Sequence, residues 1–370
     1  MAKHLIVGGG VYGAAVAWHL ARSGEEVELI EIGGLATGAS GGPGRRGVRA
    51  NGRDVREIPL MVRARKLWPT LHETLGTEPL FETTGQLQLI EREIDIAPAE
   101  ARAALQTRLG IPSRVLSSDE VRELEPDVSP SIRAGLFCPD DGVAFHEKTT
   151  LAYAALAREA GAVLREGVEA EQLLERNGKA LGILTTGGEE ILVDGKVLLF
   201  CNAGVKSLTA PWIDLPVWSR TFLVAVSKPL ENNPVRHLVG HASRTLSLKR
   251  EPDGRLMISG GRPGIWDPAT RTGTPIQSEV DLNVADAVAT YPSLEGMQIE
   301  TTDTNHLEAE STDHIPIIDS LPGNANVLYA VGWNGHGWAI APAVAEMMAD
   351  WVLEGRKPKL LEPFAFSRFG

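Results

Sequence analysis

The sequence predicts an α/β fold (α+β overall), in which a parallel sheet with flanking helices is combined with a second, mainly antiparallel domain. Three observations carry this prediction. A short apolar strand, residues 5–7, runs into the glycine-rich turn 8–13 and then into a helical pattern. Residues 217–258 form short alternating strands broken by Pro and Gly, a pattern typical of an antiparallel sheet. The chain then returns to an apolar strand, residues 327–331, followed by a second glycine-rich turn and a terminal helix.

The first turn has the spacing of a dinucleotide-binding fingerprint in a Rossmann-like domain. Gly8 permits a tight turn, Gly10 lets the backbone approach a pyrophosphate, and Gly13 lets the next helix pack on the strand. That helix, residues 14–23, points its amino end toward the phosphates. Glu31 ends the following strand, where a carboxylate accepts hydrogen bonds from ribose hydroxyls. The sequence therefore predicts a dinucleotide near the amino terminus.

The remaining elements follow from apolar periodicity and turn residues. Residues 33–44 contain so many glycines that they predict a loop, close to a ligand, rather than a regular element. Ser117 offers a helix cap. Further helices are predicted at 58–75, 97–109, 149–161, 280–291 and at the end of the chain through Leu353. Further strands are predicted at 85–90, 162–168, 191–193 and 197–200.

The nucleotide-binding domain is thus predicted in three pieces. They are residues 1–78, 142–212 and 310–370, and residues 79–141 and 213–309 form a substrate-binding domain. Nicotinamide dehydrogenases usually carry the nucleotide fold as one continuous block, whereas flavoproteins often return at the carboxyl end to complete it. The discontinuity favours a flavin.

Composition excludes several classes of partner. The 370 residues carry a formal net charge of -12, which argues against nucleic acid, because phosphate binding needs clustered Lys and Arg. Two cysteines are too few for a disulfide framework and fit a reducing compartment. No apolar run approaches the length of a membrane span, and the histidines and cysteines show no metal-ligand spacing. We expect a cytoplasmic protein without a metal site.

Six sequence blocks together resemble those of the D-amino-acid-oxidase-like FAD-dependent oxidoreductases, in particular the sarcosine oxidase and glycine oxidase branch. In chain order the blocks are Gly8–Gly13 with Glu31, Gly38–Gly41, Pro139–Gly142, Asn202–Gly204, Thr312–Ile318 and Gly332–Trp338. The resemblance runs nearly end to end. It implies FAD, with the adenosine over the first turn and the flavin between the two domains.

The resemblance, joined to the two glycine-rich turns, gives a set of cofactor-binding residues. The second glycine-rich turn, residues 332–338, is called the closing turn, and the first, residues 8–13, the opening turn. Amides of the closing turn, at the positive end of the terminal helix, would face the flavin edge where negative charge gathers on reduction. The set is Gly8, Gly10, Val11, Tyr12, Gly13, Glu31, Ala39, Ser40, Gly41, Arg46, Val168, Ala203, Gly204, Gly335, His336, Gly337 and Trp338.

Four residues are candidates for catalysis. Arg46 and Arg49 lie in a basic segment that looks like the Arg-x-x-Arg of sarcosine oxidases, in which one arginine lies by the flavin and the next binds the substrate carboxylate. A guanidinium suits that task because its donors form a bidentate fork. Glu308 stands where glycine oxidases carry a carboxylate-binding arginine, so it would favour a basic or secondary amine, or else pair with one of the two arginines. His336 completes the set.

Two comparisons within the resemblance concern the flavin. His306 falls where sarcosine oxidases carry the cysteine linked to FAD, which makes it a candidate for covalent attachment; a hydrogen-bonded histidine is the alternative. Met257 takes the position of the lysine that activates oxygen in those enzymes. Lys249 is close enough in sequence to leave the choice between oxidase and dehydrogenase open.

These observations predict FAD-dependent oxidation of a carbon–nitrogen bond in an amine or amino acid, with a secondary or basic amine favoured. A hydride would pass to flavin N5, and water would hydrolyse the resulting imine. Oxygen or another acceptor would take the electrons. Alternatives are a glycine or D-amino-acid oxidase, a nicotinamide dehydrogenase, and a flavin-bearing subunit of an amine dehydrogenase complex, which would need a partner subunit.

Overall fold

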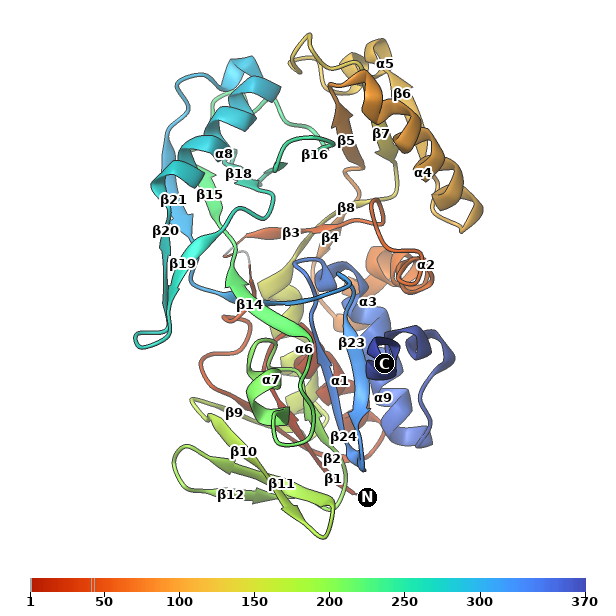
Figure 1. The fold of residues 1–370 in the computed structure, drawn as a ribbon, viewed down its shortest axis with the longest axis vertical. Helices are drawn as coiled ribbons and strands as arrows, with labels where there is room; N and C mark the ends of the chain where they lie inside the picture. Colours follow the sequence, from red (N-terminus) through yellow and green to blue (C-terminus); the bar gives the residue numbers. More distant parts are fainter. Residues whose placement is uncertain (1, 41, 43) are drawn as a thin grey trace.

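The computed structural model describes residues 2–40, 42 and 44–370 and has two lobes along its long axis (Figure 1). The lower lobe is built on a six-stranded sheet whose strands come from three distant parts of the chain. In spatial order they are β23 (Ile317–Leu321), β24 (Asn324–Val331), β13 (Val197–Leu199), β1 (Lys3–Val7), β2 (Glu26–Glu31) and β9 (Val163–Glu166). All are parallel except β23, which pairs with β24 in the antiparallel sense at the edge.

Both faces of this sheet are covered, as its apolar strands require. On one face α1 (Val11–Arg22) packs between α6 (His146–Glu159) and α9 (Ala341–Glu354). The other face is covered by the small sheet β10 (Ala170–Arg176), β11 (Lys179–Thr185) and β12 (Glu190–Leu192), and by α7 (Gly204–Thr209). The parallel, helix-flanked sheet confirms the predicted fold class.

The upper lobe is built on an eight-stranded sheet. Its order is β21 (Ile299–Asp303), β15 (Val224–Ser227), β18 (Leu256–Ser259), β17 (Ser247–Arg250), β16 (Leu238–His241), β5 (Gln86–Ile90), β7 (Ala134–Cys138) and β6 (Arg114–Ser117). Neighbouring strands are antiparallel except for the parallel pair β16 and β5, where two distant segments of the chain meet.

The two faces of the upper sheet differ in character. One face packs against α4 (Ile96–Arg108), α5 (Ser118–Leu124) and α8 (Gln277–Thr290) and is apolar, with Leu87, Val239 and Leu248 in one cross-strand row. Because side chains alternate along a strand, the next row, which includes Gln88 and Ser247, points to the opposite face. That face is directed toward the lower lobe.

Short elements join the lobes. They are the sheet β3 (Arg45–Val48), β8 (Gly142–Phe145) and β4 (Phe81–Glu82), the pair β14 (Val217–Thr221) and β22 (Leu307–Ser311), and the hairpin β19 (Gly264–Asp267) and β20 (Thr272–Pro275). The 3-10 turns are η1 (Trp68–Thr70), η2 (Glu93–Asp95), η3 (Pro292–Leu294), η4 (Gly337–Ile340), η5 (Lys359–Phe364) and η6 (Phe366–Phe369). The predicted domain limits, which place both lobes on discontinuous segments, stay a prediction.

The structure corrects two predicted elements. The helix predicted at 58–75 is divided into α2 (Ile58–Leu67), η1 and α3 (Leu71–Leu75), because Pro69 cannot continue the hydrogen-bond ladder. The terminal helix does not begin at the closing turn: the 3-10 turn η4 comes first, and α9 starts at Ala341 with a proline in its first turn. Strand β3 was not predicted. Ser117 caps α5 through a complete capping box, as expected.

Among the described residues, no helix combines the length and the apolar character needed to cross a lipid bilayer.

Candidate active site

The opening turn leaves no room for a side chain at two of the three fingerprint glycines, Gly8 and Gly13. Gly8 has φ +113°, and a Cβ there would lie 2.7 Å from the backbone of Phe200, after β13. A Cβ on Gly13 would lie 1.9 Å from the carbonyl oxygen of Gly8, so only glycine lets α1 pack this closely. Gly10 is different, since a Cβ there would meet no atom of the described residues within 4 Å. Its backbone faces open space that a ligand can occupy.

Glu31, at the end of β2, closes the neighbouring loop. One carboxylate oxygen accepts a hydrogen bond from the amide of Gly9 at 2.6 Å, and the other accepts from the amide of Gly33 at 2.9 Å. Each oxygen keeps a second lone pair, so the carboxylate can also accept from a ribose hydroxyl.

The opening and closing turns touch each other, although more than 300 residues separate them. The hydroxyl of Tyr12 donates to the carbonyl of Gly337 at 2.6 Å. The ring of Tyr12 stacks on Trp333 with centroids 4.0 Å apart. The indole of Trp68, in η1, supports the residues after the closing turn by donating to the carbonyl of Ala339 at 2.8 Å. Both ends of the chain therefore form one structural unit.

A cavity of about 360 Å³ lies between the two turns, and we call it the cofactor cavity. Twelve of the predicted cofactor-binding residues line it: Gly8, Gly10, Val11, Tyr12, Glu31, Ala39, Ser40, Arg46, Ala203, Gly335, Gly337 and Trp338. His306 also lines it, with its imidazole 3.5 Å from the carboxylate of Asp303.

The other predicted residues have different places. Gly13 serves helix packing, and Gly204 begins α7. Val168 donates its amide to the carbonyl of Glu31 at 2.9 Å and is not among the described residues that line the cavity. His336 lines a neighbouring cavity. Gly41 lies outside the described residues.

Glu308, on β22, is held on the cofactor side. Its carboxylate accepts hydrogen bonds from the hydroxyl of Ser40 at 2.5 Å, from the amide of Gly335 at 2.8 Å and from the side chain of Asn202 at 3.3 Å. Burial raises its pKa, and these donors oppose the rise. Because this carboxylate ties Gly335 of the closing turn to Ser40, selection of a basic substrate by Glu308 gains no support from the geometry.

A second cavity, of about 350 Å³, lies against the polar face of the upper sheet, and we call it the substrate cavity. Gln86, Gln88, Ser247 and Ser259 project into it from neighbouring strands. It shares three lining residues with the cofactor cavity: Ser40, Arg46 and Gly335. The two cavities therefore adjoin one another.

Arginines supply positive charge to the substrate cavity. Arg49, just after β3, donates to the carbonyl of Asn51 at 2.7 Å, and within the described residues no carboxylate lies at ion-pair distance from it. Burial lowers the pKa of Arg49 to about 10, and Arg53 adds to this effect. Burial likewise lowers the pKa of Arg46, which lines both cavities, to about 10. A cation whose charged form is destabilised by burial favours an anionic ligand, because the ligand's charge compensates its own.

Lys249 adds a third cation to the same cavity. The register of the upper sheet places Lys249, on β17, opposite Met257, on β18. The lysine therefore lines the cavity from the strand next to the one on which the resemblance places the oxygen-activating lysine. Burial, reinforced by Arg46, lowers its pKa to about 7. Within the described chain its ammonium has no hydrogen-bond or ion-pair partner.

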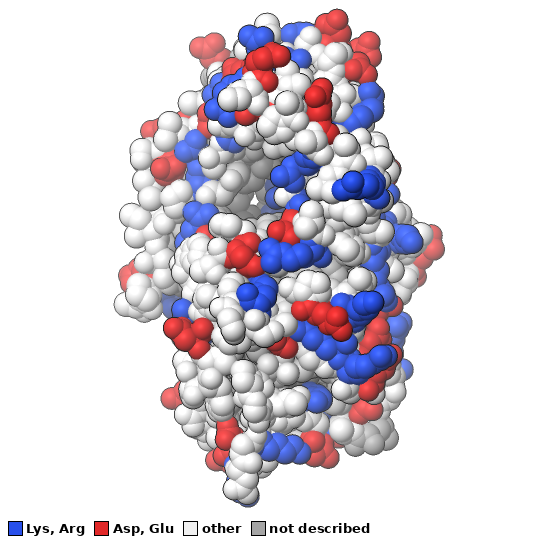
Figure 2. Space-filling model, turned by 45° about the vertical axis from the view of Figure 1, so that its right-hand side comes forward, with Lys and Arg blue, Asp and Glu red and all other residues white. Residues whose placement is uncertain are grey.

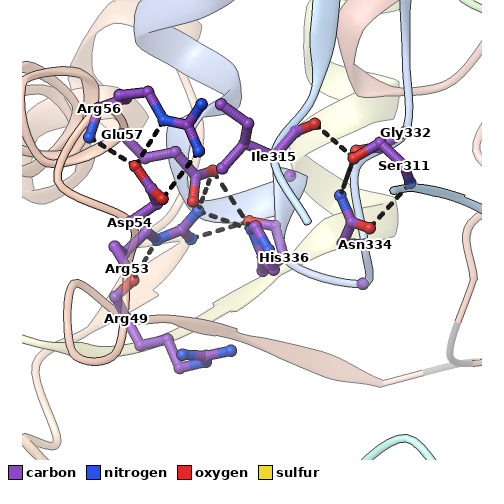
Figure 3. A network of polar contacts seen from close by, with 12 residues as sticks. Arg49, Arg53, Asp54, Arg56, Glu57, Ser311, Ile315, Gly332, Asn334 and His336 are labelled. Atoms are coloured by element: carbon purple, nitrogen blue, oxygen red, sulfur yellow. Dashed lines mark hydrogen bonds and ion pairs between the residues drawn. The ribbon is translucent and has the colours of Figure 1, made fainter. Parts of the chain in front are cut away.

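A buried polar network positions the segment that carries Arg49 and Arg53 against the closing turn (Figure 3). The guanidinium of Arg53 donates to the carbonyl of Arg49 at 3.1 Å, to the carbonyl of His336 at 2.8 Å and to the carboxylate of Glu57 at 3.2 Å. Asp141 holds the other side of the segment by accepting from the amides of Ala50 and Asn51.

The surface agrees with an accessible cationic site. Figure 2 shows a hollow in the upper part of the molecule, with Lys and Arg side chains along its edge.

The chain matches a family described as FAD dependent oxidoreductase over residues 3–351. The chain belongs to this family. It is therefore an FAD-dependent oxidoreductase, and the predicted cofactor is confirmed. The residues present fit FAD: the cavity joins both glycine-rich turns, Gly10 opens into it without a Cβ, and Glu31 offers free lone pairs.

Three similar proteins are named as oxidases or as a subunit of one. N-methyl-L-tryptophan oxidase of Salmonella arizonae is 28% identical and covers 99% of this chain and 98% of that protein. Sarcosine oxidase subunit beta of Arthrobacter sp is 26% identical, over 99% of this chain and 90% of that protein. 4-methylaminobutanoate oxidase (formaldehyde-forming) of Paenarthrobacter nicotinovorans is 25% identical over 95% of this chain, which spans 44% of that relative's length.

Among solved structures, L-proline dehydrogenase from P. horikoshii has a TM-score of 0.90 and 26% identity, covering 99% of this chain and 97% of that one. The glycine oxidase of Geobacillus kaustophilus, at 22% identity and a TM-score of 0.87, shares the fold.

Sequence reasoning missed several residues of the site. Arg53 and Glu57 carry a local signal, a basic and an acidic residue four apart at the start of a helix. Gln86 and Gln88 alternate with apolar neighbours, which indicated a half-buried strand but not what its polar face would border. The approach of Ser40 to Glu308 depends on tertiary contacts alone.

Proposed function

We propose that the protein oxidises the carbon–nitrogen bond of a secondary amino acid, an amine that also carries a carboxylate. One observation carries the proposal: Arg49 is a partly buried guanidinium in the substrate cavity, beside the cofactor cavity, with no carboxylate partner in the described chain. A substrate carboxylate would supply that partner, and a guanidinium binds it through two parallel hydrogen bonds.

The names of similar proteins agree with this substrate class. Sarcosine, N-methyl-L-tryptophan and 4-methylaminobutanoate, named for three relatives, all combine a methylated amine with a carboxylate. L-proline, named for a similar structure, is a cyclic secondary amine with a carboxylate. Glycine, in contrast, is a primary amine.

Bound FAD supplies an acceptor for the hydride that leaves the carbon next to the amine. The chain's own residues do the rest. Arg49 would orient the substrate by its carboxylate, while Gly8, Gly10 and Glu31 would hold the cofactor at the opposite end of the joined cavities. An orientation of this kind fixes which substrate carbon lies toward the shared wall of Ser40, Arg46 and Gly335.

The charge of the substrate cavity has a second use. Hydride leaves a neutral amine more readily than an ammonium ion, because the nitrogen lone pair stabilises the iminium ion that forms. Arg46, Arg49 and Lys249 all place positive charge in this cavity, and nearby cations lower the pKa of a bound ammonium. The same residues would therefore bind the carboxylate and favour loss of the amine proton.

An anaerobic screen tests the proposal. FAD-loaded enzyme is mixed with sarcosine, L-proline, N-methyl-L-tryptophan and 4-methylaminobutanoate, and with pyrrolidine as the matched control that lacks the carboxylate of proline. We expect bleaching of the flavin absorbance by at least one of the acids and none by pyrrolidine. Bleaching by simple amines but by none of the acids would refute the assignment of Arg49.

A second candidate is a flavin-bearing subunit that passes electrons to a partner rather than to oxygen. The similarity to sarcosine oxidase subunit beta and to L-proline dehydrogenase favours it. Substrate-reduced enzyme that is reoxidised by an artificial acceptor but not by air would support this candidate, whereas rapid reoxidation by air would support a self-sufficient oxidase.

A further inference from the structure

His336 lines the substrate cavity and is not among the described residues that line the cofactor cavity. The neighbouring Gly337 lines the cofactor cavity, and 18% of the His336 side chain is exposed. Within the described chain no hydrogen bond uses its Nε2 atom, and all of its side-chain contacts are made through Nδ1. One ring nitrogen is therefore held by the protein, and the other is available to a ligand.

Two buried charged groups compete for the Nδ1 atom. Arg53 and Glu57 form an ion pair in which each side chain is 1% exposed. The Nη1 atom of Arg53 lies 3.1 Å from Nδ1 of His336, and the carboxylate of Glu57 lies 3.4 Å from the same atom. Both contacts cannot be hydrogen bonds to one tautomer, because Arg53 requires an acceptor at Nδ1 and Glu57 requires a donor there.

The geometry favours the contact with Arg53. A guanidinium only donates, so a proton on Nδ1 would point at a second N–H group, and the distance to Arg53 is the shorter of the two. Nη1 has two hydrogens, one for Glu57 and one for His336, and Nη2 donates to the carbonyl of His336. Glu57 already has its donor in Arg53.

The charges around the imidazole agree with a neutral ring. The groups that act on it are Glu57, which raises its pKa, and Arg53 and Arg49, which lower it. Burial is the largest effect and lowers the pKa of His336 below its ordinary value. At neutral pH the ring therefore carries one proton.

We propose that the buried Arg53–Glu57 pair holds His336 in the tautomer with its proton on Nε2, and that this N–H group joins Arg49 in binding the substrate carboxylate. The same guanidinium that orients His336 also donates to the carbonyl of Arg49, so one side chain aligns both donors (Figure 3). Arg53 is thus a positioning residue. The carboxylate ligand rests on the proposed function, whereas the tautomer does not.

Nuclear magnetic resonance tests the tautomer directly. The FAD-loaded enzyme is labelled with ¹⁵N in histidine, and the His336 signals are assigned by their loss in the His336→Gln variant. We expect a protonated Nε2 and an unprotonated Nδ1 at neutral pH. A proton on Nδ1 would overturn the proposal whatever the activity of the enzyme.

Arg53→Gln tests the positioning role, with Arg56→Gln as the matched control. Arg56 pairs with Asp54 and Asp313 and has no contact with His336. In Arg53→Gln the unpaired Glu57 should draw a proton to Nδ1, so that substrate binding becomes tighter as falling pH converts His336 to the doubly protonated form. Arg56→Gln should leave the His336 signals in place. Unchanged signals in a folded Arg53→Gln variant would contradict the role of Arg53.

Two substitutions of His336 test the ligand and do not depend on Arg53. Gln places an amide near the position of Nε2, whereas Asn places an acceptor near Nδ1 and leaves no donor at Nε2. We expect His336→Asn to raise the Kd of the amino acid that bleaches the flavin by roughly ten- to a hundredfold, and His336→Gln to raise it much less. Equal losses in both variants would refute the carboxylate contact. If no amino acid bleaches the flavin, the proposed function fails, and the resonance experiment still decides the tautomer.

Discussion

Replacement of Arg49 by Met should stabilise the protein and weaken substrate binding. Met removes the charge but keeps most of the side-chain volume. Burial lowers the pKa of this guanidinium from its ordinary value to about 10, a difference that corresponds to about 3 kcal/mol of cost for holding the charge in the cavity. The lost hydrogen bond to the carbonyl of Asn51 offsets about 1 kcal/mol of the gain. The expected stabilisation is therefore at most about 2 kcal/mol.

The cost of holding the Arg49 charge in the cavity should also contribute to substrate binding. A carboxylate that pairs with Arg49 relieves the cost of the buried charge, so its removal should raise the Kd of the substrate by roughly a hundredfold. Flavin content should stay constant, because Arg49 lines the substrate cavity and is not among the described residues that line the cofactor cavity.

Thermal unfolding at saturating FAD, with and without substrate, measures both effects. Without substrate, the wild type should unfold at a lower temperature than the variant. Addition of substrate should raise the unfolding temperature of the wild type more than that of the variant. Arg63→Met is the matched control, since Arg63 forms a half-exposed pair with Glu346 and should change stability by at most about 1 kcal/mol. Loss of flavin in proportion to loss of substrate binding would instead assign Arg49 to the cofactor and refute the reasoning.

Three further predictions concern the opening turn, residues 8–13, and Lys249. Tyr12→Phe leaves the carbonyl of Gly337 without its donor, so we expect a loss of about 1–3 kcal/mol in unfolding free energy, measured with urea; an unchanged midpoint would contradict this. Gly10→Ala should fold but bind FAD weakly, because its Cβ meets only the cavity, whereas Gly13→Ala should not fold normally; circular dichroism and flavin titration separate the two. Lys249→Met should stabilise the protein by about 3 kcal/mol more at pH 7 than at pH 9.5, since the cost of a pKa lowered to about 7 is full below pH 7 and fades toward pH 10.5. A gain that is equal at both pH values would exclude a buried ammonium.

Local features of the chain were predictable because their causes lie within a few residues. Gly8 and Gly13 are required by backbone sterics that the spacing of the motif already encodes. The capping box at Ser117 and the alternation along β5 follow from neighbouring residues in the same way. Similarity along nearly the whole chain extended these signals to a family and to FAD.

The predicted site was partly reassigned because orientation depends on packing. Glu308 was expected to select a basic substrate or to pair with Arg46 or Arg49, and in the structure the hydroxyl of Ser40 and the amide of Gly335 hold it on the cofactor side. His336 was assigned both to catalysis and to the cofactor-binding glycines, and it lines the other cavity. A motif fixes the backbone of a turn; it does not fix the side to which a non-glycine side chain points.

The sequence by itself determined that a dinucleotide-binding turn opens the chain and that a glycine-rich turn near the end completes the same domain. Only the tertiary structure decided which cations share the substrate cavity. Lys249 reaches it because the register of β17 points that side chain away from the helices, and a shift of one residue would turn it into the apolar core. Strand register and the meeting of distant segments arise from long-range packing, which no local pattern specifies.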